Sequence, residues 1–321
     1  MTEVAVEAAD GKAEQVHQDM RDEILAALRQ PQPELPSKYF YDDRGARLFE
    51  RICTLPEYYP TRAELAILEA YAADIAAELG PGCEIVEPGS GEGVKIRRLL
   101  SALDRPSVYR PIDVAGAQLD EAAATLRAEY PRLTVTPVHA DFTRPLDLPP
   151  AQGRRVFFFP GSTIGNFLPE EAIGLLRQWH AVAGTQGRLL IGVDLRKDPE
   201  TLRAAYNDAA GVTAEFNRNI LRHINRALGA DFVPEQWQHE ATYDERSGRV
   251  EMWLQALRDQ RVQLPPDAPL DFRAGQRIRT EYSCKYAIEE FEQLAGRAGW
   301  GPICAWTDPD ALFSLQLFRA A

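Results

Sequence analysis

The chain has 321 residues, a length that predicts two domains or one large domain with an insertion. Of these residues 45% are hydrophobic and 26% charged, a composition typical of a globular protein. It excludes collagen-like, low-complexity and wholly disordered proteins. The 48 acidic and 36 basic residues give a net charge of −12, which argues against nucleic acid or an anionic membrane surface as a partner.

Cysteine and histidine are too scattered to suggest a metal site or a disulfide framework. The four cysteines form no Cys-x-x-Cys pair, and the five histidines show no ligand spacing. The N-terminal segment has no apolar signal core, and no run of apolar residues is long enough to span a membrane. We therefore expect a cytoplasmic, monomeric protein that binds no metal.

The first part of the chain predicts two helices separated by a proline-rich break. Apolar residues recur at helical spacing over 13–29, and the prolines within 31–36 end that run. A second helical run starts near Arg62 and stops at Gly80-Pro81-Gly82.

Short apolar runs then alternate with helical runs, which predicts a parallel, doubly wound α/β sheet. The run 155–159 is nearly all apolar, as expected of a strand buried on both faces. We expect strands at 83–87, 107–114, 133–139, 155–159 and 187–195, and helices at 92–103, 118–129 and 169–182.

After Lys197 the pattern changes. We expect a long helical region at 198–227, antiparallel strands at 240–253 and 255–259, a helix at 288–298, and closing strands at 303–307 and 312–318. The predicted domains are 61–196 plus 287–321 for the doubly wound sheet, and 1–60 plus 197–286 for a second, α+β lobe.

The first predicted strand runs into a glycine-rich turn at 87–95. Such a turn lets the backbone approach a nucleotide closely. Asp113 ends the second strand, where an acid can accept hydrogen bonds from two ribose hydroxyls, and Asp141-Phe142 ends the third, where an acid and an aromatic ring can flank adenine.

Two ligands fit this arrangement. A dinucleotide would place its pyrophosphate over the turn, whereas S-adenosylmethionine has no phosphate. Glu87 and Glu92 suit a sulfonium and an ammonium better than a pyrophosphate, and the closing hairpin also fits a methyltransferase sheet. The pattern therefore favours a methyltransferase over a dehydrogenase, and a glycine turn that binds nothing stays an alternative.

Several separate motifs extend this interpretation. They are Tyr41-Asp42-Asp43 with Leu48-Phe49, and the segments 55–62, 161–166, 206–213, 216–219, 251–254 and 280–285. Together they resemble the histidine-specific Nα-methyltransferase family, which forms hercynine, the trimethylated histidine betaine of ergothioneine biosynthesis. The resemblance extends from about Leu35 to Phe318. It implies a Rossmann-like class I methyltransferase sheet with an α+β substrate-binding lobe, S-adenosylmethionine as methyl donor and L-histidine as substrate.

The resemblance also implies a role for each matching residue. The methyl donor is expected to be bound by Gly89, Lys95, Asp113, Asp141 and Phe142. The substrate carboxylate is expected to be bound by Asn166 and Tyr206, and the reacting amine is expected to lie near Gly161 and Tyr41. The imidazole is expected to be bound by Tyr58, Glu281 and Ser283. The chain departs from the family in the first turn, with Pro88 in place of a bulky apolar residue and Glu92-Gly93 in place of Ser or Thr.

These residue types suit the chemistry. Neutral histidine has one ring donor and one ring acceptor, and Glu281 and Ser283, two residues apart on an extended segment, point the same way. Methyl transfer from sulfur to nitrogen moves a positive charge without creating one, so alignment of the reacting atoms supplies most of the acceleration. Methylation of another amino acid and donor binding without catalysis remain alternatives.

Overall fold

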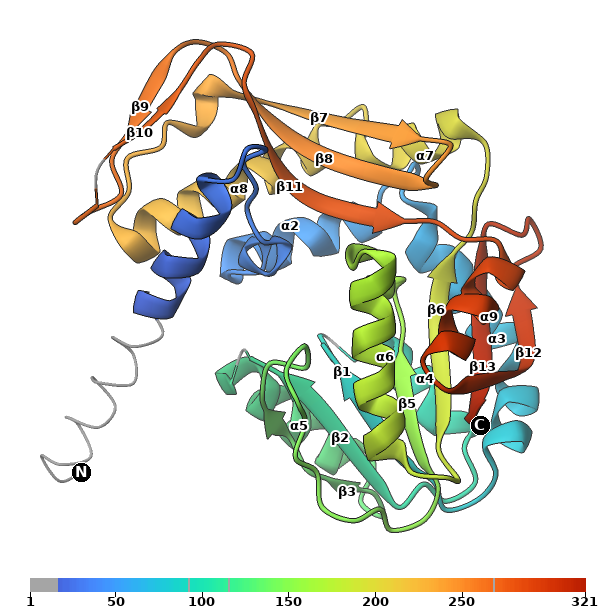
Figure 1. Cartoon of the computed structure of the whole chain (residues 1–321). Coiled ribbons are helices and arrows are strands. Elements are labelled where there is room, and N and C mark those ends of the chain that lie inside the picture. The colour runs from blue at the N-terminus through green and yellow to red at the C-terminus, as the bar shows by residue number, and fades with distance from the viewer. Residues whose placement is uncertain (1–16, 92, 115, 268) are drawn as a thin grey trace, which may run out of the picture. The chain divides into compact units, whose positions relative to one another are not determined.

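The computed structural model describes residues 17–321 except 92, 115 and 268. They form two compact units, each built from more than one stretch of chain (Figure 1). The first, which we call the α/β unit, consists of Tyr59–Lys197 and Ser283–Ala321. The second, the α+β unit, consists of the described residues up to Tyr58 together with Asp198–Tyr282. The chain therefore passes between the units after Tyr58, Lys197 and Tyr282.

The α/β unit is organised by an eight-stranded sheet in the order β12-β13-β6-β5-β1-β2-β3, with β4 also pairing with β2. Its strands are β1 (Glu84–Pro88), β2 (Val108–Asp113), β3 (Thr134–Val135), β4 (Val138–His139), β5 (Arg155–Phe159), β6 (Arg188–Asp194), β12 (Trp300–Thr307) and β13 (Phe313–Ala320). The strands from β1 to β6 pair in parallel, whereas β13 is antiparallel to both β6 and β12. This confirms the predicted doubly wound sheet with a closing hairpin. The strand expected at 133–139 is two short strands, β3 and β4.

Helices cover both faces of this sheet (Figure 1). They are α3 (Tyr59–Leu79), α4 (Val94–Ala102) and α5 (Gly116–Glu129) on one face, and α6 (Pro169–Ala183) and α9 (Ile288–Arg297) on the other. Strand β5 shows the alternation that this requires. Its Val156 and Phe158 lie in the core with α3, whereas Phe157 and Phe159 pack with α6 and α9. The expectation of a strand buried on both faces is confirmed.

A buried ion cluster joins three strands of this sheet. Glu84 begins β1 and is fully buried; its Oε1 accepts from Arg110 Nε at 2.6 Å and from Arg155 Nη2 at 3.1 Å. The Gln152 amide donates to Glu84 Oε2 at 3.2 Å. Both guanidinium groups are also buried, so this single carboxylate compensates two cations.

Substituting Glu84→Ala should therefore leave two buried guanidinium groups without a counter-charge. We expect the free energy of unfolding to fall by about 3–5 kcal/mol, measured by urea denaturation. Glu69→Ala, on the exposed face of α3, serves as the control and should change it by less than about 0.5 kcal/mol. A loss below about 1 kcal/mol in Glu84→Ala would contradict this account of the cluster.

The α+β unit carries helices and two small sheets. Its elements are a helix over 17–28, η1 (Ser37–Phe40), α2 (Asp43–Cys53), α7 (Pro199–Tyr206), α8 (Val212–Leu228), η3 (Pro234–Gln236), β7 (Trp237–Asp244), β8 (Arg249–Ala256), β9 (Gln260–Val262), β10 (Leu270–Phe272) and β11 (Arg277–Cys284), of which the last two residues belong to the α/β unit. The sheets are β11-β8-β7 and β10-β9. The start of the helix expected at 13–29 lies outside the described residues.

Two expectations for this unit were wrong. The single strand expected at 240–253 is a hairpin of β7 and β8, turning at 245–248, where Gly248 has φ +65°. Residues 255 and 256 end β8, and 257–259 are not a strand; β9, β10 and β11 were not foreseen. The helical region at 198–227 is broken where Asp208 accepts from the amides of Val212 and Thr213 and so begins α8.

Across the part of the chain that the structure describes, no helix combines the length and the apolar character needed to cross a membrane.

Candidate active site

The glycine turn after β1 has the backbone geometry that only glycine adopts readily. Gly89, Gly91 and Gly93 have φ values of +66°, +49° and +74°, and Gly93 is the N-cap of α4. The Gly89 amide donates to the Ile112 carbonyl at 2.7 Å. A Cβ at Gly89 would lie 3.3 Å from Cε1 of Phe142, so the turn is close to that ring. Two of the predicted donor residues are thus brought together, while Glu92 lies outside the described residues.

The other predicted donor residues end neighbouring strands. Asp113 ends β2, where its register partner is His139 of β4, and the Ala140 amide donates to the Asp113 carbonyl at 3.2 Å. Asp141 and Phe142 follow at once. Their position at the carboxyl ends of parallel strands is the one where doubly wound sheets bind nucleotides.

Phe142 is held by other aromatic side chains. Its ring centroid lies 5.7 Å from that of Phe159, 6.4 Å from that of Phe167 and 6.4 Å from that of Trp179. Asp141 Oδ1 accepts from the amide and the hydroxyl of Thr143, at 2.9 and 2.6 Å. Both residues are therefore fixed in place by the protein itself.

Glu87 lies buried beneath the turn. Tyr109 donates to its Oε2 at 2.5 Å. Burial raises the pKa of Glu87 to about 8, because the loss of hydration outweighs the hydrogen bond from Tyr109 and the charge of Lys95. At neutral pH this carboxyl therefore carries its proton in the free protein, and a bound cation beside it would favour ionisation.

Lys95 and Gly161, predicted for the donor and for the amine, are joined by a residue that the sequence did not single out. Glu64 of α3 is fully buried, and its Oε2 lies 2.6 Å from Lys95 Nζ. The Gly161 amide donates to both Glu64 oxygens, at 3.0 and 2.9 Å. The sequence feature that could have identified Glu64 is its position on the apolar face of a predicted helix, beside Ile67 and Leu68, where an acid is unusual.

Asn166 is the last residue of the 3₁₀ turn η2 (Thr163–Asn166), which follows β5. Asn166 itself is half-buried. The turn packs tightly, since a Cβ at Gly165 would lie 2.8 Å from the Cys284 carbonyl oxygen. Only glycine fits there, so the turn that carries Asn166 lies close against the backbone of Cys284.

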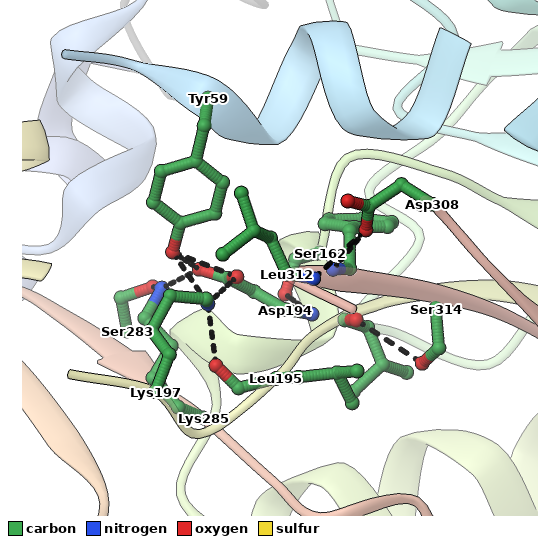
Figure 2. A network of polar contacts seen from close by, with 12 residues as sticks. Tyr59, Ser162, Asp194, Leu195, Lys197, Ser283, Lys285, Asp308, Leu312 and Ser314 are labelled. Atoms are coloured by element: carbon green, nitrogen blue, oxygen red, sulfur yellow. Dashed lines mark hydrogen bonds and ion pairs between the residues drawn. The ribbon is translucent and has the colours of Figure 1, made fainter. Parts of the chain in front are cut away.

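Ser283 belongs to a buried polar network centred on Asp194 (Figure 2). Lys197 Nζ lies 2.6 Å from Asp194 Oδ1, and Lys285 Nζ lies 2.6 Å from Oδ2. Lys285 also donates to Ser283 Oγ at 2.7 Å, and the Tyr59 hydroxyl donates to the Asp194 carboxylate at 2.9 Å. Within the α/β unit, the predicted imidazole-binding serine is thus oriented by a lysine.

The charges of this network explain its pKa shifts. Burial by itself raises the pKa of Asp194, but the two ammonium groups outweigh it and hold that pKa below its usual range. Burial lowers the pKa of Lys197 to about 8, against the opposing attraction of Asp194. The sequence did not reveal this network, because Tyr59, the pair Asp194 and Lys197, and the pair Ser283 and Lys285 come from three separate segments.

In the α+β unit, the three predicted tyrosines belong to one aromatic cluster. The Phe49 ring centroid lies 5.7 Å from that of Tyr41 and 6.1 Å from that of Tyr58, and Tyr58 and Tyr206 lie 6.5 Å apart. Phe216 packs against Tyr41 at 5.8 Å. Three residues expected to bind substrate are thus gathered by packing.

Glu281, on the half-buried face of β11, acts electrostatically on this cluster. Burial of the phenol, and then the charge of Glu281, raise the pKa of Tyr41 above its ordinary value, although 47% of the residue's surface as a whole remains exposed. The pKa of Tyr58 is also raised, first by burial and further by neighbours that include Glu281. Both phenols therefore keep their protons at neutral pH and act as hydrogen-bonding groups, not as phenolates.

Several other residues of the quoted motifs support the backbone. Asp42 caps α2 by accepting from the Gly45 amide at 2.7 Å and also accepts from Asn219. Asn217 donates to the Trp253 carbonyl at 3.0 Å and contacts His239 Nδ1 at 2.8 Å. These motif residues hold the elements that carry the aromatic cluster.

Comparison with known proteins agrees with this geometry. The family described as histidine-specific methyltransferase, SAM-dependent, matches residues 20–320. The chain belongs to this family. The expected resemblance and fold class are therefore confirmed, and the protein is a methyltransferase that uses S-adenosylmethionine.

Three relatives illustrate the family. A histidine N-alpha-methyltransferase of Mycolicibacterium smegmatis is 41% identical over 314 residues, which cover 97% of this chain and 96% of that protein. Ergothioneine biosynthesis protein 1 of Neurospora crassa is 34% identical over 85% of this chain and 32% of that protein. A 4-dimethylallyltryptophan N-methyltransferase of Aspergillus fumigatus is 28% identical over 92% of this chain and 93% of that protein.

The residues around the glycine turn of this methyltransferase fit its methyl donor. Gly89 and Gly91 expose backbone without a side chain, Asp113 is a carboxylate at the end of β2, and the Phe142 ring lies beside Gly89. Among the described residues, no three His, Cys, Asp or Glu side chains are grouped so that they could hold a metal ion.

Substituting Asp113→Ala should weaken donor binding first, because it removes the expected acceptor for the ribose hydroxyls. We expect the dissociation constant for S-adenosylhomocysteine, measured by calorimetry, to rise about tenfold to a hundredfold. Glu121→Ala, an exposed acid of α5, is the control. Unchanged affinity in Asp113→Ala would remove the ribose role.

Substituting Glu87→Gln should change how stability depends on pH. The pKa of Glu87 is about 8 in the folded protein and 4.5 ordinarily, so the folded state binds the extra proton between these values. The wild type should lose up to about 1.4 kcal/mol of stability per pH unit relative to the variant as the pH rises through this window. Urea denaturation between about pH 5 and pH 8 measures this, and parallel curves for the two proteins would contradict the buried, protonated state.

Proposed function

We propose that this methyltransferase transfers three methyl groups from S-adenosylmethionine to the α-amino nitrogen of L-histidine and so forms hercynine, as in ergothioneine biosynthesis. The observation that carries the proposal is the match to a histidine N-alpha-methyltransferase over 97% of the chain. The polar side chains of β11 support it, since they suit a ring with one donor and one acceptor.

The donor is held by residues of the α/β unit. We assign Gly89, Lys95, Asp113, Asp141 and Phe142 to this task. When bound, S-adenosylmethionine supplies a methyl group activated by a positively charged sulfur. Asp113 accepts from the ribose, and Phe142 covers the adenine side next to the glycine turn.

The amino acid is held by polar groups at both ends. Asn166 and Tyr206 bind its carboxylate, and Tyr58, Glu281 and Ser283 bind its imidazole. Because the Ser283 oxygen accepts from Lys285, its hydroxyl acts as a donor to the unprotonated ring nitrogen. Glu281 accepts from the protonated one. A substrate with an apolar side chain would offer the Glu281 carboxylate no ring N–H donor, which disfavours that substrate relative to histidine.

Gly161 and Tyr41 act on the reacting amine. Tyr41 keeps its proton, since burial and Glu281 raise its pKa, so it orients the amine by a hydrogen bond and does not remove the amine proton as a phenolate. The amine proton passes to water. Gly161 has no side chain, which leaves room for the second and third methyl groups.

Mass spectrometry of L-histidine incubated with the enzyme and S-adenosylmethionine tests the proposal directly. We expect the mono-, di- and trimethyl products in sequence. A panel of free amino acids is the necessary comparison, because one relative acts on a tryptophan derivative by its name. Preference for tryptophan or tyrosine would move the assignment to another amino acid, and donor binding without turnover on any amine would indicate a non-catalytic protein.

Substituting Glu281→Ala should weaken histidine binding and spare the donor, because this carboxylate is assigned to the ring alone. We expect histidine affinity to fall about tenfold or more in calorimetry, with donor affinity within about twofold of the wild type. Glu245→Ala, in the exposed β7–β8 turn, is the control. Equal loss of both affinities would show that the assignment is wrong.

A further inference from the structure

Glu64 is a fully buried carboxylate with a specific set of partners in the α/β unit. Lys95 Nζ lies 2.6 Å from its Oε2, and the Gly161 amide donates to both of its oxygens at 3.0 and 2.9 Å. Burial of a carboxylate is tolerated only when cations and hydrogen bonds compensate it. The two partners belong to different segments, the first turn of α4 and the loop after β5.

The sheet is shaped to admit this side chain. Gly192 lies within β6, where glycine weakens a strand because it adds backbone freedom and no packing. A Cβ at Gly192 would lie 2.2 Å from Glu64 Oε1, a distance that no side chain permits. The absence of a side chain at Gly192 thus makes room for the Glu64 carboxylate.

The loop that Glu64 holds is strained. Gly161 has φ +81° and Ser162 has φ +56°, and a positive φ in a residue with a Cβ persists only where the surroundings enforce it. Glu64 holds the Gly161 amide, and the Asp194 amide donates to Ser162 Oγ at 2.9 Å. Two fixed partners therefore impose this backbone conformation.

We propose that Glu64 is a positioning residue for methyl transfer. Its one carboxylate binds both Lys95 and the loop that carries Gly161. The distance between Lys95, which holds the donor, and Gly161, which lies beside the amine, is thereby kept constant. This inference rests on the proposed function, in which Lys95 binds the donor and Gly161 lies next to the reacting nitrogen. Glu64 itself is separated from the substrates by these two residues and acts through them.

Glu64→Gln preserves the volume and removes the charge. One carboxylate oxygen becomes an NH₂ group, which faces donors on Gly161 and Lys95 and cannot accept from them. We expect the dissociation constant for S-adenosylhomocysteine to rise about tenfold in calorimetry and kcat with histidine to fall about tenfold or more. Glu69→Gln, on the exposed face of the same helix, is the matched control and should retain wild-type values.

A double-mutant cycle with Lys95→Gln separates positioning from a purely structural role. If Glu64 acts on the donor through Lys95, adding Glu64→Gln to Lys95→Gln should weaken donor binding by less than about twofold further. An undiminished tenfold effect in the Lys95→Gln background would overturn the proposal, because Glu64 would then act without Lys95.

Glu64→Asp keeps the charge but withdraws the carboxylate by one methylene, and it covers the case in which Glu64→Gln does not fold. We expect a smaller loss in the same direction. Wild-type donor affinity and kcat in either folded variant would overturn the proposal, as would failure of both variants to fold, which would show that Glu64 serves the fold. A wild type that binds donor but leaves histidine unmethylated would refute the proposed function alone, since donor affinity still tests the coupling of Glu64 and Lys95.

Discussion

The rest of the α/β unit depends on the ion pairs that the buried carboxylate of Asp194 forms with Lys197 and Lys285. A charge without water is tolerated only with close counter-charges, and here two ammonium groups and a phenol surround it. The chain passes between the two units after Tyr58, after Lys197 and after Tyr282. Tyr59 and Lys197 lie directly at the first two of these points, and Lys285 lies three residues after the third. The same network therefore fixes, on the α/β side, the places where the chain enters and leaves that unit.

Strand β6 links this network to the proposed chemistry. The backbone amide of its last residue, Asp194, donates to Ser162 Oγ, and Gly192, two residues earlier in the strand, leaves space for Glu64. The loop carrying Gly161 is thus held by the Asp194 backbone amide and the Glu64 carboxylate. Such support matters for methyl transfer, because the reaction gains its rate mainly from alignment of nitrogen, carbon and sulfur.

The sequence was most informative where local pattern and function coincide. Alternating apolar and helical runs predicted the parallel sheet, and acids at strand ends predicted Asp113 and Asp141 beside the glycine turn. The strands from Trp237 to Cys284 were predicted less well, because β7 is largely polar and half-exposed and only the short turn at 245–248 separates it from β8. The sequence carried a signal for Glu64, an acid on an apolar helix face, but the contacts of Glu64 and of the Asp194 network could not be foreseen, since the partners are distant in sequence and become neighbours only through tertiary packing. The roles of the individual substrate-binding residues stay predictions.

The absence of a side chain at Gly192 has a practical consequence for engineering. A saturation library that varied only residues lining the substrates would leave this position out, yet any larger residue there would drive a carboxylate out of the interior. Directed evolution toward bulkier amino acids is therefore better confined to the aromatic cluster of Tyr58 and Tyr206, where altered shape does not disturb a buried charge. Strand β6 therefore limits sequence change at Gly192 for a steric reason.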